Sequence, residues 1–238
     1  MVTAEALEAI VGKDYVITDK GQIEPYTVDA TPPAMMPKAA ETLIVVKPAN
    51  SQEVSDILKL ANTENTSVWV RGGGTGMAAG AIPTKDGIIL SMERFDKIIE
   101  VDKRNMMAVA EAGVTLGELL QAAEAENMSF PPHPGDEGAQ LGGLAVCNAG
   151  GARAVKFGVM RNYVKGLEVV LPTGEIVMLG GKLLKNNTGM PLLHLMVDSE
   201  GILGVVTKVV LRLYPSFPGT ATLVISYDDR NDAINTVP

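Results

Sequence analysis

One short loop in this sequence has the composition needed to hold a phosphate group through its backbone. It reads Arg71-Gly72-Gly73-Gly74-Thr75-Gly76 and follows Ser67-Val68-Trp69-Val70, a run typical of a strand. Because glycine lacks a Cβ, successive backbone N–H groups can converge on an anion there. The alternative is a tight loop that only connects two strands, but four glycines in six residues exceed that need.

The spacing of this loop excludes two common nucleotide-binding fingerprints. Met77 and Ala79 occupy the positions where the third glycine of G-x-G-x-x-G would fall. No Gly-Lys-Ser/Thr follows, so the loop is not a Walker loop either. An NAD-binding Rossmann protein is therefore an alternative to be tested and not the expectation.

Two further glycine-containing clusters lie later in the chain. The first combines Pro131-Pro132-His133-Pro134-Gly135 with Leu141-Gly142-Gly143 and Asn148-Ala149-Gly150-Gly151, and these small residues could line a narrow cleft. The alternative is a pair of glycine-rich loops without a ligand. The second cluster, Asp198-Ser199-Glu200-Gly201-Ile202-Leu203-Gly204, is an ordinary loop when read alone.

The titratable residues near these clusters do not predict a catalytic group. His194 lies in an apolar run and is expected in the core, whereas His133 is the better candidate to contact a cofactor or substrate. Cys147 is expected to be a buried, inert thiol. Asp136 and Glu137 are expected to be solvated loop charges. Two distant histidines without further ligands predict no metal site, and the catalytic residues stay unassigned.

Charge and composition exclude several classes of partner. The 238 residues carry a formal net charge of −8 and only 4% aromatic residues, which argues against nucleic acid and anionic membranes as partners. The single cysteine excludes an internal disulfide. The N-terminus resembles no signal peptide, and no apolar run reaches the roughly 18 residues that span a bilayer. We expect a cytoplasmic protein without a transmembrane segment.

The patterning predicts an α+β fold in two parts. Residues 42–46, 67–70 and 87–91 read as strands, and a helix capped by Asn50 or Ser51 lies between the first two, which indicates a parallel βαβ arrangement. The second part is mostly antiparallel, with predicted strands at 98–101, 107–110, 166–171, 175–179 and 205–213 and a helix opened by the capping box Thr115-Leu116-Gly117-Glu118. We expect subdomains at 1–96 and 97–220, then a strand at 222–227 that begins a truncated C-terminal cap domain over 221–238.

Taken together and in this order, the three glycine segments resemble the FAD-linked oxidase family, whose flavin domain is of the vanillyl-alcohol-oxidase type. The similarity is greatest to glycolate oxidase FAD subunits and D-lactate dehydrogenases. Supporting matches are Tyr26 with Asp29, Val46-Lys47-Pro48, Gly113-Val114-Thr115-Leu116 and Gly158-Val159 with Arg161-Asn162. The resemblance covers nearly the whole chain.

The resemblance implies that FAD lies between the two subdomains. The loop 71–77 would wrap the pyrophosphate, segments 134–140 and 147–150 would line the flavin and ribityl side, and 200–206 would meet the adenine end or the nearby ribose. The loop contains no histidine, so we expect FAD to be bound without a covalent link. The implied cofactor-binding residues are Arg71, Gly72, Gly73, Gly74, Thr75, Gly76, Met77, Pro134, Gly135, Asp136, Gly142, Gly143, Asn148, Ala149, Gly150, Glu200, Gly201, Ile202, Val205 and Val206.

The implied activity is the oxidation of a 2-hydroxy acid such as lactate or glycolate, with hydride transfer to FAD and electrons passed to an acceptor protein or quinone. In this family the catalytic base and the arginines that bind the substrate come largely from the cap domain. Two alternatives stay open. The same domain could serve another alcohol or sugar, or the chain could be a flavin-binding module with no substrate site of its own.

Overall fold

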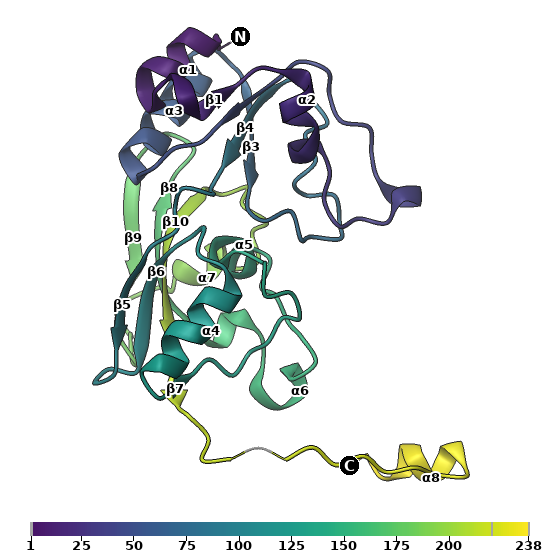
Figure 1. Cartoon of the computed structure of the whole chain (residues 1–238). Coiled ribbons are helices and arrows are strands. Elements are labelled where there is room, and N and C mark those ends of the chain that lie inside the picture. Colours follow the sequence, from purple (N-terminus) through teal and green to yellow (C-terminus); the bar gives the residue numbers. More distant parts are fainter. Residues whose placement is uncertain (1, 220, 238) are drawn as a thin grey trace.

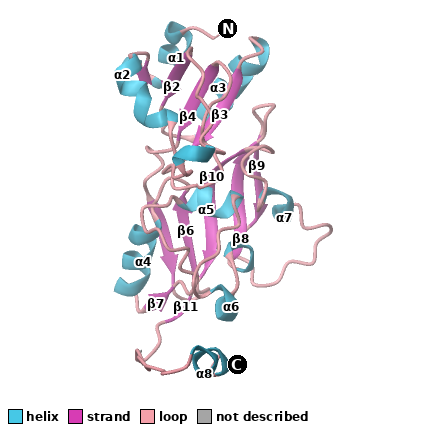
Figure 2. Cartoon of the chain, turned by 90° about the vertical axis from the view of Figure 1, so that its right-hand side faces the viewer, coloured by secondary structure: helices cyan, strands magenta, loops and turns pink. Residues whose placement is uncertain are grey.

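The computed structural model describes residues 2–219 and 221–237, and the expected subdomain boundary at 220 lies outside them. Two α+β subdomains are stacked along the long axis of the molecule (Figure 1). Each has its own sheet, and Figure 2 shows the two sheets one above the other. The predicted α+β class is therefore confirmed. No helix in the described ranges is both long and apolar enough to cross a membrane.

The first subdomain has a four-stranded sheet of order β1-β2-β4-β3 in which β2, β4 and β3 run parallel. This confirms the predicted βαβ arrangement. Short 3-10 turns lie at Lys13–Tyr15, Glu24–Thr27 and Pro33–Met35. The helices and strands are α1 (Ala4–Val11), β1 (Val16–Ile17), α2 (Lys20–Ile23), β2 (Leu43–Val46), α3 (Ser51–Thr63), β3 (Ser67–Arg71) and β4 (Gly87–Ser91).

The second subdomain has a five-stranded antiparallel sheet of order β5-β6-β10-β8-β9. A two-stranded ribbon of β7 and β11 lies at its far end, and a 3-10 turn covers Met160–Asn162. The elements are β5 (Ile98–Asp102), β6 (Met107–Glu111), α4 (Leu116–Ala125), β7 (Met128–Ser129), α5 (Leu141–Val146), α6 (Ala154–Phe157), β8 (Val164–Val170), β9 (Ile176–Gly180), α7 (Leu193–Met196), β10 (Val205–Arg212) and β11 (Tyr214–Pro215).

The two predicted helix starts are confirmed. The Asn50 side chain caps α3 by accepting a hydrogen bond of 3.0 Å from the Glu53 amide. Thr115 and Glu118 form the expected capping box at α4. Both helices bury the apolar face that their spacing predicts, because the side chains three and four residues apart share one side.

Polar contacts join the subdomains along α3. The Ser55 hydroxyl donates to the Gly174 carbonyl at 2.5 Å, and the Asn62 amide donates to the Pro172 carbonyl, so α3 holds the turn between β8 and β9. Ser51 also donates to the Glu168 carboxylate at 2.5 Å. In Figure 1 this interface lies on the left of the molecule, opposite the protruding residues of the 24–40 segment. The relative position of the two sheets is thereby fixed on one side.

The strand predicted at 222–227 is wrong. The described residues 221–227 form no strand, and Leu223 and Val224 are 82% and 90% exposed. A strand needs a neighbouring strand to accept its backbone hydrogen bonds, and this segment extends away from both sheets toward the short helix α8 (Arg230–Asn235) (Figure 1).

Candidate functional site

The glycine loop follows β3, as predicted, and lies where the two subdomains meet. A Cβ on Gly73 would stand 2.9 Å from the carbonyl oxygen of Gly138, and a Cβ on Gly72 would stand 3.3 Å from Oε1 of Gln140. The loop therefore contacts segment 138–140 of the second subdomain directly. Glycine is needed at Gly73 because any side chain would separate the two segments. The fold thus brings together two of the clusters found in the sequence.

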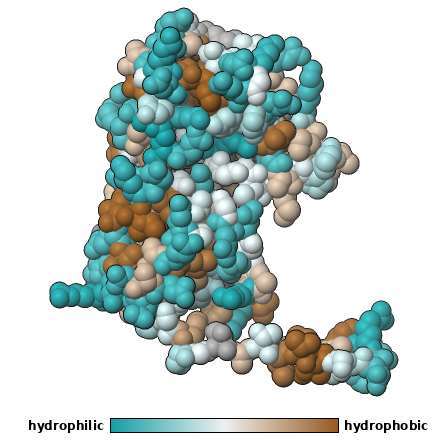
Figure 3. Space-filling model, viewed as in Figure 1, coloured by the Kyte–Doolittle hydropathy of each residue, from teal (hydrophilic) through white to brown (hydrophobic). Residues whose placement is uncertain are grey.

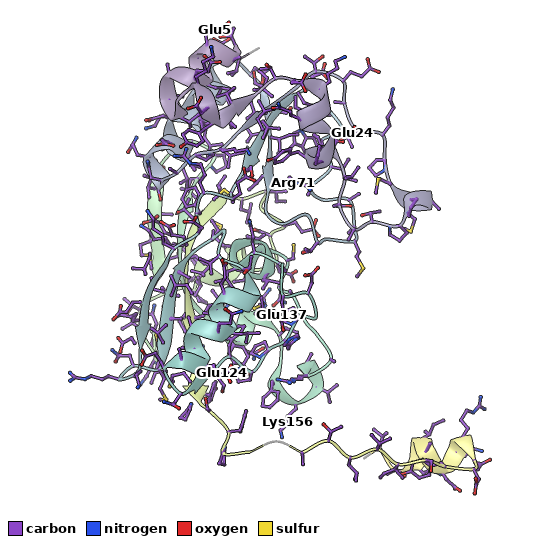
Figure 4. All side chains as sticks on the ribbon, viewed as in Figure 1. Glu5, Glu24, Arg71, Glu124, Glu137 and Lys156 are labelled. Atoms are coloured by element: carbon purple, nitrogen blue, oxygen red, sulfur yellow. The ribbon has the colours of Figure 1, made fainter. Side chains whose placement is uncertain are left out.

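Arg71 begins this loop but directs its side chain elsewhere. The guanidinium donates to the carbonyl oxygens of Val28 at 2.7 Å and Pro25 at 3.1 Å, and the side chain is buried. Figure 4 places Arg71 at the end of the first subdomain, beside the junction. Burial lowers the pKa of Arg71, and the nearby Asp29 carboxylate opposes that shift. The Arg71 guanidinium therefore donates its hydrogen bonds to backbone carbonyls of the same chain.

Several predicted site glycines face open space. A Cβ on Gly76, Gly135, Gly143 or Gly201 would meet no protein atom within 4 Å beyond the chain neighbours. In Figure 3 the right-hand outline is indented between the 24–40 segment and the second subdomain, and pale residues surround the indentation. An extended ligand can therefore approach the backbone at these positions.

The helix α5 connects the two ends of this surface. Its N-cap residue, Gln140, touches the glycine loop at Gly72, and its C-cap residue is Cys147. Gly142 is buried with its Cα against Ala112, whereas Gly143 on the outer side is exposed. Of this predicted pair, only Gly143 presents its backbone to the surface.

The far end of α5 meets the third predicted segment. The Glu200 amide donates to the Val146 carbonyl at 2.9 Å. The Asn148 side chain accepts from the Arg161 amide at 2.9 Å, and the Arg161 guanidinium donates to the Val197 carbonyl at 3.1 Å. Arg161 therefore clamps segments 146–148 and 197–200 together, a role that its position in the sequence did not reveal.

The remaining predicted residues divide into exposed and buried ones. Thr75, Pro134 and Ala149 are half-buried, while Met77, Asp136, Gly150, Glu200 and Ile202 are exposed. Val205 and Val206 lie in β10, are 3% and 6% exposed, and belong to the hydrophobic core. Their side chains pack between layers and do not reach the surface where Gly201 is open.

Two expectations for titratable residues are wrong. His194 is exposed, because α7 is a single helical turn that follows a long exposed loop on the surface. Cys147 is also exposed at the end of α5, although partial desolvation and the carboxylates of Glu200 and Asp198 raise the pKa of its thiol. Asp136 is an exposed loop charge, as expected.

Glu137 is exposed too, as expected, and its carboxylate lies 3.1 Å from Nε2 of His133, from which it accepts a hydrogen bond when Nε2 carries the hydrogen. Figure 4 shows Glu137 on the second subdomain, on the loop that precedes α5. Across residues 2–219 and 221–237, no three His, Cys, Asp or Glu side chains gather as metal ligands.

The surface has the features that the FAD implied by the sequence would require. It offers a glycine loop with an open side at Gly76 and a second open backbone at Gly143. Beside the loop, the side-chain oxygen of Gln140 is buried without a hydrogen-bond partner among the described residues. Buried polar atoms are normally satisfied, so this oxygen fits contact with a ligand or ordered water. The residues of this surface therefore fit FAD.

Comparison with known families agrees with this geometry. A family model described as FAD binding domain matches residues 42–180, which is more than half of the chain. The match includes the glycine loop, segment 134–143 and segment 147–150.

Curated relatives are similar over most of this chain. D-lactate dehydrogenase from Archaeoglobus fulgidus is 51% identical over 89% of the chain and 48% of its own length. D-lactate dehydrogenase from Anaerostipes hadrus is 40% identical over 82% of the chain and 41% of its own length, and the glycolate oxidase subunit GlcD of Bacillus subtilis is 37% identical over 89% and 44%. The chain spans about half the length of the curated relatives it matches.

Solved structures share the fold at low sequence identity. A 4-ethylphenol oxidase from Gulosibacter chungangensis superposes with a TM-score of 0.76 at 21% identity, covering 91% of this chain and 43% of that one. An alkyldihydroxyacetonephosphate synthase superposes with a TM-score of 0.75 at 23% identity, covering 89% and 40%. At these identities the likeness establishes the fold alone.

Proposed function

Because the chain belongs to the FAD binding domain family, we propose that it holds FAD without a covalent link and serves a flavin-dependent oxidoreductase of 2-hydroxy acids. The observation that carries the cofactor assignment is the glycine loop, whose side at Gly76 is open and whose other side contacts the second subdomain. The substrate class is supported by the names of the relatives, D-lactate dehydrogenase and glycolate oxidase.

The residues of this chain would bind and orient the cofactor. Backbone N–H groups of 72–77 would hold the pyrophosphate, segments 134–136, 143 and 148–150 would lie along the flavin and ribityl chain, and 200–202 would meet the adenine end. Bound FAD would supply the redox chemistry by accepting a hydride, which is a proton with two electrons, from the hydroxyl-bearing carbon of the substrate, while the hydroxyl proton would pass to a base. An acceptor protein or a quinone would then take the electrons.

Non-covalent binding is supported by the residues near the loop. The loop 71–77 contains no histidine or cysteine, and Cys147 has a raised thiol pKa, which disfavours the nucleophilic thiolate at neutral pH. Acid precipitation of the loaded protein tests this point. Flavin in the supernatant supports the proposal, and yellow flavin in the washed pellet contradicts it.

A matched pair of glycine variants tests the cofactor assignment. A Cβ on Gly76 or on Gly80 would meet no protein atom within 4 Å beyond the chain neighbours, so valine at either position should leave the fold intact. We expect Gly76→Val to lose FAD, measured by flavin absorbance after gel filtration, while Gly80→Val retains it. Equal retention by both variants would place the pyrophosphate elsewhere.

The substrate proposal needs a second measurement on the loaded protein. Bleaching of the flavin absorbance by D-lactate or glycolate supports a 2-hydroxy-acid substrate. Bleaching by dithionite but by neither hydroxy acid supports the alternative of a flavin-binding module. A protein that binds NAD and no flavin would overturn the whole proposal.

A further inference from the structure

Residues 25–31, here called the strap, lie alongside the glycine loop and bond to it at two points. The Ala30 amide donates to the Gly74 carbonyl at 3.1 Å, and the Ala79 amide donates to the Thr31 hydroxyl at 2.7 Å. Gly74 has φ +69° and Ala79 has φ +58°. Within 71–83 these are the two residues with left-handed backbone, and the strap holds both.

The left-handed conformation at Ala79 requires such external support. A residue with a Cβ pays roughly 1 kcal/mol or more for this conformation and keeps it only where the surroundings impose it. Thr31 is 4% exposed, so its hydroxyl is a fixed acceptor and not a mobile surface group. The shape of the glycine loop therefore depends on the position of the strap.

The strap is in turn held by Arg71. The guanidinium of Arg71 donates to three backbone carbonyls of the strap: Nη1 to Val28 at 2.7 Å and Tyr26 at 3.3 Å, and Nη2 to Pro25 at 3.1 Å. A planar fork of donors suits this arrangement, which a single ammonium group cannot reproduce. Arg71 is 8% exposed, and a Cβ on Gly74 would stand 2.9 Å from its Cζ, so the guanidinium lies directly under the loop.

We propose that Arg71 is a positioning residue for the FAD pyrophosphate: it holds the strap, and the strap fixes the left-handed residues Gly74 and Ala79 that shape the loop. The inference rests on the proposed function for the identity of the ligand. It departs from the role expected of an arginine beside a phosphate-binding loop, because the charge of Arg71 faces protein carbonyls.

The test compares two arginine variants in the cofactor-free chain. Arg94 is the matched control, since it also donates to a backbone carbonyl, that of Lys47 at 2.8 Å, and stacks on Tyr15 away from the loop. Amide hydrogen exchange is followed by NMR at Ala30 and Ala79, and the Kd for FAD is measured by flavin fluorescence. We expect Arg71→Lys to accelerate exchange at both amides and to raise the Kd by about tenfold, as for the loss of one charge-assisted hydrogen bond. Arg94→Lys should change neither.

Two outcomes overturn the proposal. Weaker FAD binding with unchanged exchange at Ala30 and Ala79 would show that Arg71 contacts the cofactor itself. Unchanged FAD binding despite faster exchange would show that the strap does not control the site. If wild-type protein binds no FAD, the proposed function fails, while the exchange measurement still decides whether Arg71 holds the strap.

A second variant pair covers the case in which Arg71→Lys does not fold. Thr31→Val removes the hydroxyl that accepts from Ala79 and keeps the shape of the side chain, whereas Thr31→Ser keeps the hydroxyl. We expect faster exchange at Ala79 and a higher Kd for FAD in Thr31→Val only. Equal values in Thr31→Val and Thr31→Ser would overturn the link between strap and loop.

Discussion

Gly142 of α5 lies so close to Ala112, which follows β6, that a methyl group on Gly142 would stand 2.7 Å from the Cβ of Ala112. The adjacent Gly143 has no such neighbour and is exposed. One glycine therefore allows the helix to approach the sheet, and the other leaves its outer side open.

This contrast predicts opposite effects of alanine at adjacent positions. Gly142→Ala should lower the free energy of unfolding by about 1–3 kcal/mol through overpacking. Gly143→Ala should leave it unchanged or raise it by up to about 1 kcal/mol, since alanine is the better helix former. Urea denaturation of the cofactor-free chain measures both. Equal unfolding midpoints for the two variants would contradict the packing role of Gly142.

At Gly74, a branched side chain should abolish FAD retention. Valine at φ +69° is strained, and its Cβ would displace the Arg71 guanidinium that lies under the loop. Flavin content per protein after purification is the measurement, with circular dichroism to verify folding. Full flavin content in a folded Gly74→Val protein would rule out the pyrophosphate assignment.

The contacts of Glu168 predict a pH-dependent link between the subdomains. Burial raises the pKa of Glu168, but hydrogen bonds from Lys208, Ser51 and Thr207 outweigh that effect, so its pKa lies below the usual value. The stabilisation is therefore complete above the unfolded pKa of about 4.3 and is lost as the pH falls through the folded pKa.

Accordingly, the stability difference between wild type and Glu168→Gln should shrink as the pH is lowered from about 6 to about 3. Glu124→Gln, on the exposed side of α4, is the control and should match wild type at each pH. Denaturant unfolding across this range gives the measurement. A difference that stays constant with pH would mean that the carboxylate charge of Glu168 contributes nothing to the interface.

Cys147 can report on the site directly. Its exposed thiol should react slowly with iodoacetamide near neutral pH, because desolvation, Glu200 and Asp198 raise its pKa and reduce the thiolate fraction. Glu200→Gln should accelerate the reaction, and FAD should slow it by covering the end of α5. Mass spectrometry of the alkylated peptide follows the rate. A rate unaffected by saturating FAD would exclude segment 147–150 from the cofactor site.

The elements that the sequence predicts well are those encoded locally. Asn50 and Thr115 mark helix starts because a cap needs only residues within one turn, and the parallel and antiparallel strands follow from short apolar runs. The strand at 222–227 was wrong because strand formation also requires a partner, which composition does not encode.

Exposure and side-chain direction could not be predicted in the same way. His194 and Cys147 lie in apolar stretches, yet both are exposed, because α7 is a single turn on the surface and Cys147 is the C-cap residue of α5. The glycine loop was found from its composition. That Arg71 turns toward the strap depends on contacts between residues about 45 positions apart, and these exist only in the folded chain.

The strand order of the second sheet sets when this protein can first bind its cofactor during synthesis. The middle strand, β10, lies between β6 and β8 but leaves the ribosome after both of them and after β9. Until residue 212 has emerged, β6 and β8 have no common neighbour. The segments around Gly143 and Gly201 therefore have no completed sheet to pack against. We therefore expect the cofactor to bind late in synthesis, after contacts between segments far apart in the sequence have formed.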